Sequence, residues 1–161
     1  MSALAEVIGS LQKARIDYWL FGGWAVDFYV GSVTRSHDDV DIAVWFADVP
    51  QITTLLLTNG WRHAPEEDED GGTGFERGGV RLELTYLVHG DDGRIYLPLR
   101  SGPVEWPGMA ALADDVGELH GVQSRLMGFE SLLHGKATPR DDREDAAKDR
   151  ADFAHLSRLR S

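Results

Sequence analysis

Two aspartates, Asp39 and Asp41, are the residues whose type and spacing most directly suggest chemistry. They stand one residue apart at the start of an apolar run, and successive side chains of a strand point to opposite faces. Asp39 and Asp41 would therefore share one face of a strand, while Val40 and Ile42 fill the other. Hard divalent cations such as magnesium take oxygen ligands, and often use one or two carboxylates together with substrate phosphates. The pair therefore predicts a metal platform.

A glycine pair, Gly22 and Gly23, precedes the aspartates and follows residues 18–21, an aromatic and apolar run typical of a buried strand. Glycine lets a ligand approach the backbone closely because it has no side chain. Residues 24–30 have helical spacing and stop at Gly31. A glycine turn that opens a helix presents free N–H groups and the positive end of the helix dipole, which suit a phosphate. Most such pairs are ordinary turns, so this interpretation depends on the aspartates that follow.

The combined pattern is Gly-Gly-Trp-x-x-Asp followed by Gly-x-x-Thr-Arg-x-His-Asp-Asp-x-Asp-Ile, within residues 22–42. It resembles the DNA polymerase beta-like nucleotidyltransferase superfamily, and is most similar to its aminoglycoside and lincosamide nucleotidyltransferases. The resemblance implies an α+β fold, with a small mixed sheet, flanking helices and a helical C-terminal segment. It also implies that the glycine pair holds a nucleoside triphosphate and that Asp39 and Asp41 bind magnesium. A third acid is expected on a later strand.

Glu83 is the candidate for that third acid. In residues 80–88, apolar side chains alternate with Arg81, Glu83 and Thr85, as in a strand with one buried face. On this pattern alone, Glu83 could simply face solvent. The site still needs an oxygen ligand or a general base, and Glu83 is the acid placed most centrally in a predicted strand. The family more often has aspartate here, which leaves open whether Glu83 binds metal, acts as base, or does both.

These acids together would support nucleotidyl transfer. In this reaction a hydroxyl attacks the α-phosphorus of a nucleoside triphosphate, and pyrophosphate leaves in line. Two magnesium ions about 3.5–4 Å apart can stabilise the attacking and leaving oxygens, and Asp39 and Asp41 would hold them. Glu83 would accept the proton of the hydroxyl. The expected co-substrate is ATP or another nucleoside triphosphate, with AMP as the transferred group.

Two cations are candidates for phosphate binding. Arg35 lies just before the aspartates and could hold a phosphate through two N–H groups; alternatively, it bridges to Asp27 or Asp38. Lys136 is the nearest equivalent of a lysine that family members commonly carry on a late helix, so the resemblance implies contact with the triphosphate. The alternative is a surface lysine. His37 and Asp38 fall out of register with the ligand face, and we interpret them as residues that fix the loop.

Charge and composition narrow the choice of partners. The chain has 161 residues, no cysteine and a formal net charge of −11, which excludes disulfides and thiolate catalysis. An acidic surface repels nucleic acid and attracts cations, so a small, cationic acceptor with a hydroxyl group is favoured. Solubility alone also explains such acidity. The densest acidic run, residues 66–70, is either a solvated loop or an anionic lip over the acceptor pocket.

The favoured function is therefore transfer of AMP to an aminoglycoside or lincosamide antibiotic. Two alternatives remain. The acceptor could be a protein or a tRNA, as in bacterial toxin–antitoxin pairs, or the chain could be a nucleotide-binding module without activity. No signal peptide or bilayer-spanning run is recognised, so we expect a cytoplasmic protein without a membrane partner. The small size is compatible with a homodimer that frames the acceptor pocket.

The positioning elements follow from periodicity and turn signals. We expect a core over residues 1–124 and a helical segment over residues 125–161. A hairpin should turn at Gly121. The last helix is expected to pack through a narrow alanine face, and to pair Lys148 with Asp152. Helices are predicted at 1–17, 24–30, 49–59, 106–113, 125–136 and 141–159; the alanines are Ala147, Ala151 and Ala154.

Overall fold

A mixed sheet carries the acidic residues singled out above. The computed structural model describes residues 1–106 and 112–161. In the order in which they pair, the five strands of the main sheet are β1 (Tyr18–Phe21), β2 (Asp39–Trp45), β5 (Val80–His89), β4 (Gly72–Arg77) and β3 (Arg62–His63). β2 and β5 run parallel, and the other neighbours are antiparallel. The end of β5 also pairs with β6 (Ile95–Leu99), which pairs with β7 (Gly102–Glu105).

The register of this sheet brings the predicted acids together. Asp41 is the Cα partner of Glu83 across the β2–β5 ladder, and of Phe21 across the β1–β2 ladder. Partners in a ladder point to the same face, and residues two apart on a strand do so as well. Asp39, Asp41 and Glu83 therefore belong to one face of the sheet. Val40, Ile42 and Leu82 alternate with them and are buried in the core.

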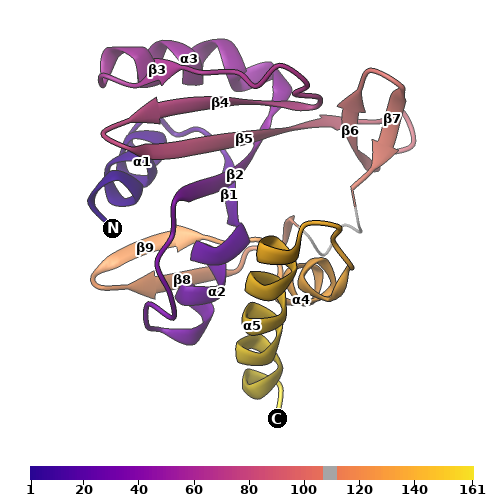
Figure 1. Ribbon diagram of the computed structural model, residues 1–161. Coiled ribbons are helices and arrows are strands. Elements are labelled where there is room, and N and C mark those ends of the chain that lie inside the picture. The colour runs from indigo at the N-terminus through magenta and orange to yellow at the C-terminus, as the bar shows by residue number, and fades with distance from the viewer. Residues whose placement is uncertain (107–111) are drawn as a thin grey trace.

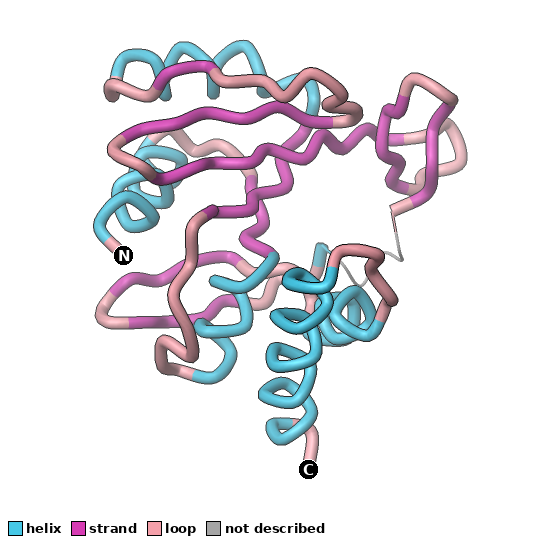
Figure 2. Tube along the Cα trace, in the orientation of Figure 1, coloured by secondary structure: helices cyan, strands magenta, loops and turns pink. Residues whose placement is uncertain are grey.

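The helices fall into two groups, visible in Figures 1 and 2. α1 (Ser2–Lys13) and α3 (Val49–Thr58) lie with the sheet in the upper half of the view, and a 3₁₀ turn (Phe46–Asp48) leads into α3. Below the sheet lie α2 (Gly22–Val30), α4 (Phe129–Ala137), α5 (Arg143–Leu159) and the hairpin of β8 (Val116–Leu119) and β9 (Val122–Arg125). One hydrophobic core joins the two groups.

The predicted fold class, α+β with a mixed sheet, flanking helices and a helical C-terminal segment, is confirmed. The hairpin turn at Gly121 is also confirmed. The predicted helix over 125–136 begins at Phe129, because Arg125 still belongs to β9 and Met127 donates its N–H to the carbonyl of Leu20. Of the helix predicted over 106–113, residues 107–111 lie outside the described part of the chain. The predicted division into a core over residues 1–124 and a helical segment over residues 125–161 stays a prediction.

The packing face predicted for the last helix is wrong. Ala147, Ala151 and Ala154 are exposed. The buried side of α5 carries Asp149, Asp152 and Leu156. The two aspartates can be buried because cations from other elements hold them, as a buried charge requires. Among the described residues, no helix has the length and apolar composition needed to cross a bilayer.

Candidate active site

The glycine pair lies directly against the aspartate strand. Gly22 opens α2 with φ +66°, and a Cβ atom added to it would stand 2.2 Å from Oδ2 of Asp41. A Cβ on Gly23 would stand 2.3 Å from a guanidinium nitrogen of Arg35 and 2.7 Å from Nδ1 of His37. Both positions therefore require glycine for space, and Gly22 requires it for conformation as well.

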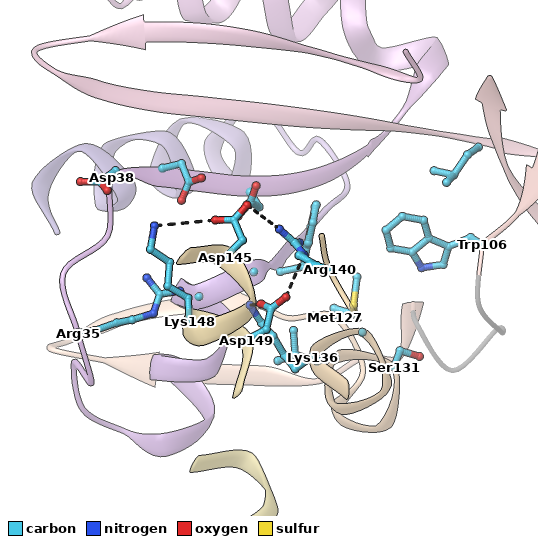
Figure 3. A pocket seen from close by; sticks show the side chains of 18 residues that line it. Arg35, Asp38, Trp106, Met127, Ser131, Lys136, Arg140, Asp145, Lys148 and Asp149 are labelled. Atoms are coloured by element: carbon cyan, nitrogen blue, oxygen red, sulfur yellow. Dashed lines mark hydrogen bonds and ion pairs between the residues drawn. The ribbon is translucent and has the colours of Figure 1, made fainter. Parts of the chain in front are cut away.

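A cavity of about 370 Å³ opens at this contact (Figure 3). β2 contributes two carboxylates to it, and the lower group of helices contributes most of the rest. Six of the seven residues predicted for the site line this cavity: Gly22, Gly23, Arg35, Asp39, Asp41 and Lys136. Asp38 also lines it, and the interpretation of Asp38 as a loop-fixing residue stays a prediction.

Asp41 is held in an environment that disfavours its charge. Burial raises the pKa of Asp41 to about 7, the nearby charges of Asp39 and Glu83 act in the same direction, and Lys136 and Arg140 oppose them. A bound divalent cation would relieve this repulsion. In the part of the chain that the structure describes, no three acidic or histidine side chains converge tightly enough to hold a metal by themselves. Two carboxylates completed by substrate phosphates are a usual magnesium site, so Asp39 and Asp41 fit the ion.

The two predicted cations are bound by α5. Arg35 forms a two-pronged contact with Asp152, through Nε at 3.2 Å and a terminal nitrogen at 3.1 Å. This salt bridge replaces the one considered with Asp27 or Asp38. Lys136 Nζ lies 2.9 Å from Asp152 and 2.8 Å from Asp149, and its side chain is 10% exposed. Lys136 is therefore a largely buried cation in the cavity wall, and the surface alternative is wrong.

Two further cations complete the wall. Arg140 lies 2.9 Å from Asp149 and 3.3 Å from Asp145, and the two contacts are drawn in Figure 3. Lys148 contacts Glu144 at 2.9 Å and Asp145 at 3.9 Å. The predicted pair of Lys148 with Asp152 is therefore wrong, because the buried Asp152 is taken by other cations. Four cations thus face the cavity, and each is held by acids of α5.

The loop between α2 and β2 is fixed as predicted for His37. Its Nε2 lies 2.5 Å from Oδ2 of Asp27, and both side chains are buried. The other oxygen of Asp27 accepts hydrogen bonds from the backbone N–H and the hydroxyl of Thr34. His37 also packs against the ring of Trp24. These contacts fix the loop that brings Arg35 and Asp39 to the cavity.

Glu83 faces a second cavity of about 380 Å³, which shares the side chains of Phe21, Leu97 and Trp106 with the first. Glu66, Glu69 and Asp70 of the acidic run line it too. The run is attached to the β6–β7 turn, because Arg100 donates its backbone N–H to Asp70 and its guanidinium to the carbonyl of Glu69. Three residues of the acidic run therefore line a cavity, while every residue of the run except Glu69 is exposed to solvent.

The carboxylate of Glu83 is bound by Arg81, two residues earlier on β5. Partial burial raises the pKa of Glu83, and the hydrogen bond and charge of Arg81 oppose that rise. Nearby Glu66 and Asp39 raise it further. Glu83 is thus a partly buried acid between the aspartates of the first cavity and the acidic run of the second.

Sequence analysis missed the acids of α5. Asp145, Asp149 and Asp152 lie on one helical face with Leu156, at spacings of four, three and four, and this pattern was the available signal. The sequence analysis took the alanines as the packing face of this helix, and it therefore overlooked the acidic face.

Comparison with known proteins finds a matching family model and short matches to curated sequences. A model of the family described as aminoglycoside-2''-adenylyltransferase matches residues 3–94, more than half of the chain. Curated 2''-aminoglycoside nucleotidyltransferases from Klebsiella pneumoniae and Escherichia coli are 33% identical over 42 residues. Those residues are 26% of this chain and 24% of each relative. The match therefore spans about a quarter of the length of the curated relatives.

Solved structures agree over nearly the whole chain. The solution structure of the antibiotic-resistance factor ANT(2'')-Ia is 18% identical, with a TM-score of 0.76, over 99% of this chain and 83% of that one. The crystal structure of the lincosamide antibiotic adenylyltransferase LnuA with lincomycin is also 18% identical, with a TM-score of 0.74, over 96% and 94%. At such identities the likeness shows a shared fold.

Proposed function

The chain belongs to the family described as aminoglycoside-2''-adenylyltransferase, and we propose that it transfers AMP from ATP to a hydroxyl of a polycationic aminoglycoside. The observation that carries the proposal is the pair of adjoining cavities. In one, Asp39 and Asp41 face a wall of cations. The other is lined by carboxylates and includes Glu83. A triphosphate suits the first cavity and a polyamine suits the second.

The first cavity would bind the nucleotide through the groups that line it. Gly22 and Gly23 open α2, so their backbone N–H groups and the positive end of the helix dipole are available to a phosphate. Arg35 and Lys136 would neutralise the triphosphate from the opposite side. Magnesium held by Asp39 and Asp41 would supply positive charge to the reacting phosphate oxygens.

The second cavity would present the acceptor. The acceptor oxygen forms a bond to the α-phosphorus while the bond from that phosphorus to the β-phosphate bridging oxygen breaks. Pyrophosphate leaves with the bonding electron pair, and the hydroxyl proton passes to the carboxylate of Glu83. A positioned base of this kind contributes about 10²–10⁴-fold to a rate. Ammonium groups of the acceptor would be held by Glu66, Glu69 and Asp70, which a single-amine lincosamide uses less fully.

The test is pyrophosphate release from ATP and magnesium with a panel of aminoglycosides and lincosamides. We expect turnover with aminoglycosides, and transfer of AMP to the acceptor seen by mass spectrometry. Asp41→Asn should abolish turnover without unfolding the chain. Modification of a protein or a tRNA, alongside no turnover with any antibiotic, would replace this function with the alternative acceptor. ATP binding without any transfer would indicate a silent module.

A further inference from the structure

We propose that Arg81 is a positioning residue that holds the Glu83 carboxylate toward the acceptor cavity. The inference rests on the proposed function, and it assigns a role to a residue outside the predicted site. Arg81 lies on β5 opposite Asp39 in the parallel ladder, so it stands next to the acidic cluster without entering the nucleotide cavity. Its side chain is 21% exposed.

The guanidinium of Arg81 is fixed on several sides. Its Nε donates to Oε1 of Glu83, and NH1 donates to the backbone carbonyl of Ala64 at 2.9 Å. Glu76 lies 3.5 Å from NH1, and Glu66 lies 3.6 Å from NH2. A planar guanidinium with several bound nitrogens cannot turn without breaking more than one contact. Glu83 is therefore held by a group that is itself rigidly placed.

Gly74 makes the room that Arg81 needs. Gly74 is the β4 partner of Glu83, and a Cβ atom at this position would stand 2.1 Å from NH2 of Arg81 and 2.6 Å from its Cζ. Its backbone is outside the left-handed region, so an alanine would fit the local conformation. The glycine is thus needed for the arginine side chain, apart from a contact at 3.0 Å with the carbonyl of Ala64.

The consequence for the reaction follows from the length of glutamate. Glu83 has one more rotatable bond than aspartate, and an unheld glutamate loses more side-chain entropy when it adopts one reactive geometry. Arg81 removes that freedom before the acceptor binds. It also directs the carboxylate to the second cavity, which Glu83 lines, and away from the first, which Asp39 and Asp41 line. The placement of Glu83 at the second cavity, apart from Asp39 and Asp41 at the first, then depends on Arg81.

The inference predicts a specific kinetic pattern for Arg81→Ala and for Gly74→Ala. Each should lower kcat with an aminoglycoside acceptor by about 30-fold, which is part of the contribution of a positioned base. KM for ATP should stay within about 2-fold of its original value, because the first cavity is unchanged. Arg81→Lys keeps the charge without the planar fork, so it should recover part of kcat. Arg77→Ala removes another arginine, which binds Glu6 and the carbonyl of Asn59, and should leave kcat unchanged.

The double variant Gly74→Ala/Arg81→Ala separates this role from general damage. If Gly74 acts through Arg81, the double variant should be no slower than Arg81→Ala alone. Unchanged kcat in both single variants, additive losses, or a loss of kcat matched by a rise in KM for ATP would each overturn the inference while leaving the proposed function intact. Melting temperatures identify any variant that fails to fold, and Arg81→Lys then carries the kinetic test. Absence of turnover in the unmodified protein would defeat the proposed function, and this inference with it.

Discussion

Gly22 and Asp41 are in direct contact: a methyl group on the glycine would lie 2.2 Å from Oδ2 of the aspartate. The β1–β2 ladder creates this contact, because Asp41 is the partner of Phe21, the residue just before Gly22. The two halves of the sequence motif are thus packed against each other. The first turn of the helix that opens at Gly22 therefore lies beside Asp41, so a phosphate on a metal ion held by Asp41 would be close to the free N–H groups of that turn.

Gly22→Ala should therefore abolish activity by a larger margin than its effect on stability explains. The variant places a side chain at φ +66°, which costs about 1–2 kcal/mol, and it displaces the Asp41 carboxylate. Gly31→Ala is the matched control, because Gly31 ends the same helix at φ +79° and a Cβ there has nothing within 4 Å. Thermal melts and pyrophosphate release should show similar destabilisation in both variants, and loss of turnover in Gly22→Ala alone. Equal turnover would disprove the importance of the contact.

The raised pKa of Asp41 predicts an unusual pH dependence of stability. Because the folded pKa is about 7 and the unfolded value is 3.8, the native state binds more protons than the unfolded state between these values. Stability from this group is therefore lost as pH rises from about 4 to 7. Asp41→Asn removes the charge, and should stabilise the metal-free protein at pH 8 by about 2 kcal/mol, after allowance for partial exposure.

Magnesium should reverse the destabilising effect of the Asp41 charge at pH 8. In the original protein, magnesium with ATP should raise the melting temperature at pH 8, since a ligand bound by the native state stabilises it. Asp41→Asn should lose this rise together with activity. Denaturant melts at pH 4 and pH 8, with and without magnesium and ATP, measure both effects. A variant that is less stable than the original at pH 8 without metal would contradict the assigned environment of Asp41.

The sheet face of the site was predictable because strand alternation is local. Asp39, Asp41 and Glu83 are each assigned to a face by their immediate neighbours, and the structure places Asp41 opposite Glu83. Their pairing required a parallel β2–β5 ladder, which no local pattern specifies. The family resemblance supplied the expectation of a third acid on a later strand, and alternation within residues 80–88 located it.

The cationic wall was predictable only in part, because burial of charge depends on partners distant in sequence. Lys136 and Arg35 were identified, but their acids on α5 were not. Asp152 is fully buried and lies between cations from a loop and from α4. A highly charged helix usually has a solvated charged face, so local sequence favours exposure. Strand β4 was not predicted either, because its residues follow an acidic run and begin with glycine, which are features typical of a loop.

Asp152→Asn should weaken nucleotide binding more than chemistry. Burial alone would raise the pKa of Asp152, but hydrogen bonds from Arg35 and Lys136 outweigh it and lower the pKa. Removing this charge leaves Arg35 without its buried partner and leaves Lys136 with Asp149 alone, which costs about 3 kcal/mol of stability. Both cations are then held less firmly, so KM for ATP should rise about 10-fold, with a smaller change in kcat. Glu130→Gln, at an exposed acid of α4 that contacts Arg160 and does not line the cavity, is the control and should alter neither quantity. A normal KM for ATP in Asp152→Asn would show that the wall does not need this acid.

Glu69→Gln tests the acidic wall of the second cavity. Glutamine keeps the oxygen that accepts the N–H of Glu66, so the loop should retain its shape while one negative charge is lost. We expect KM for a polycationic aminoglycoside to rise about 5-fold at low salt, and the difference to shrink as salt screens the attraction. KM for ATP should not change, because Glu69 lines the second cavity and not the first. Glu67→Gln removes the same charge from an exposed residue of the same run that lines neither cavity. If the two variants weaken the acceptor equally, the run acts through its overall charge and Glu69 makes no specific contact.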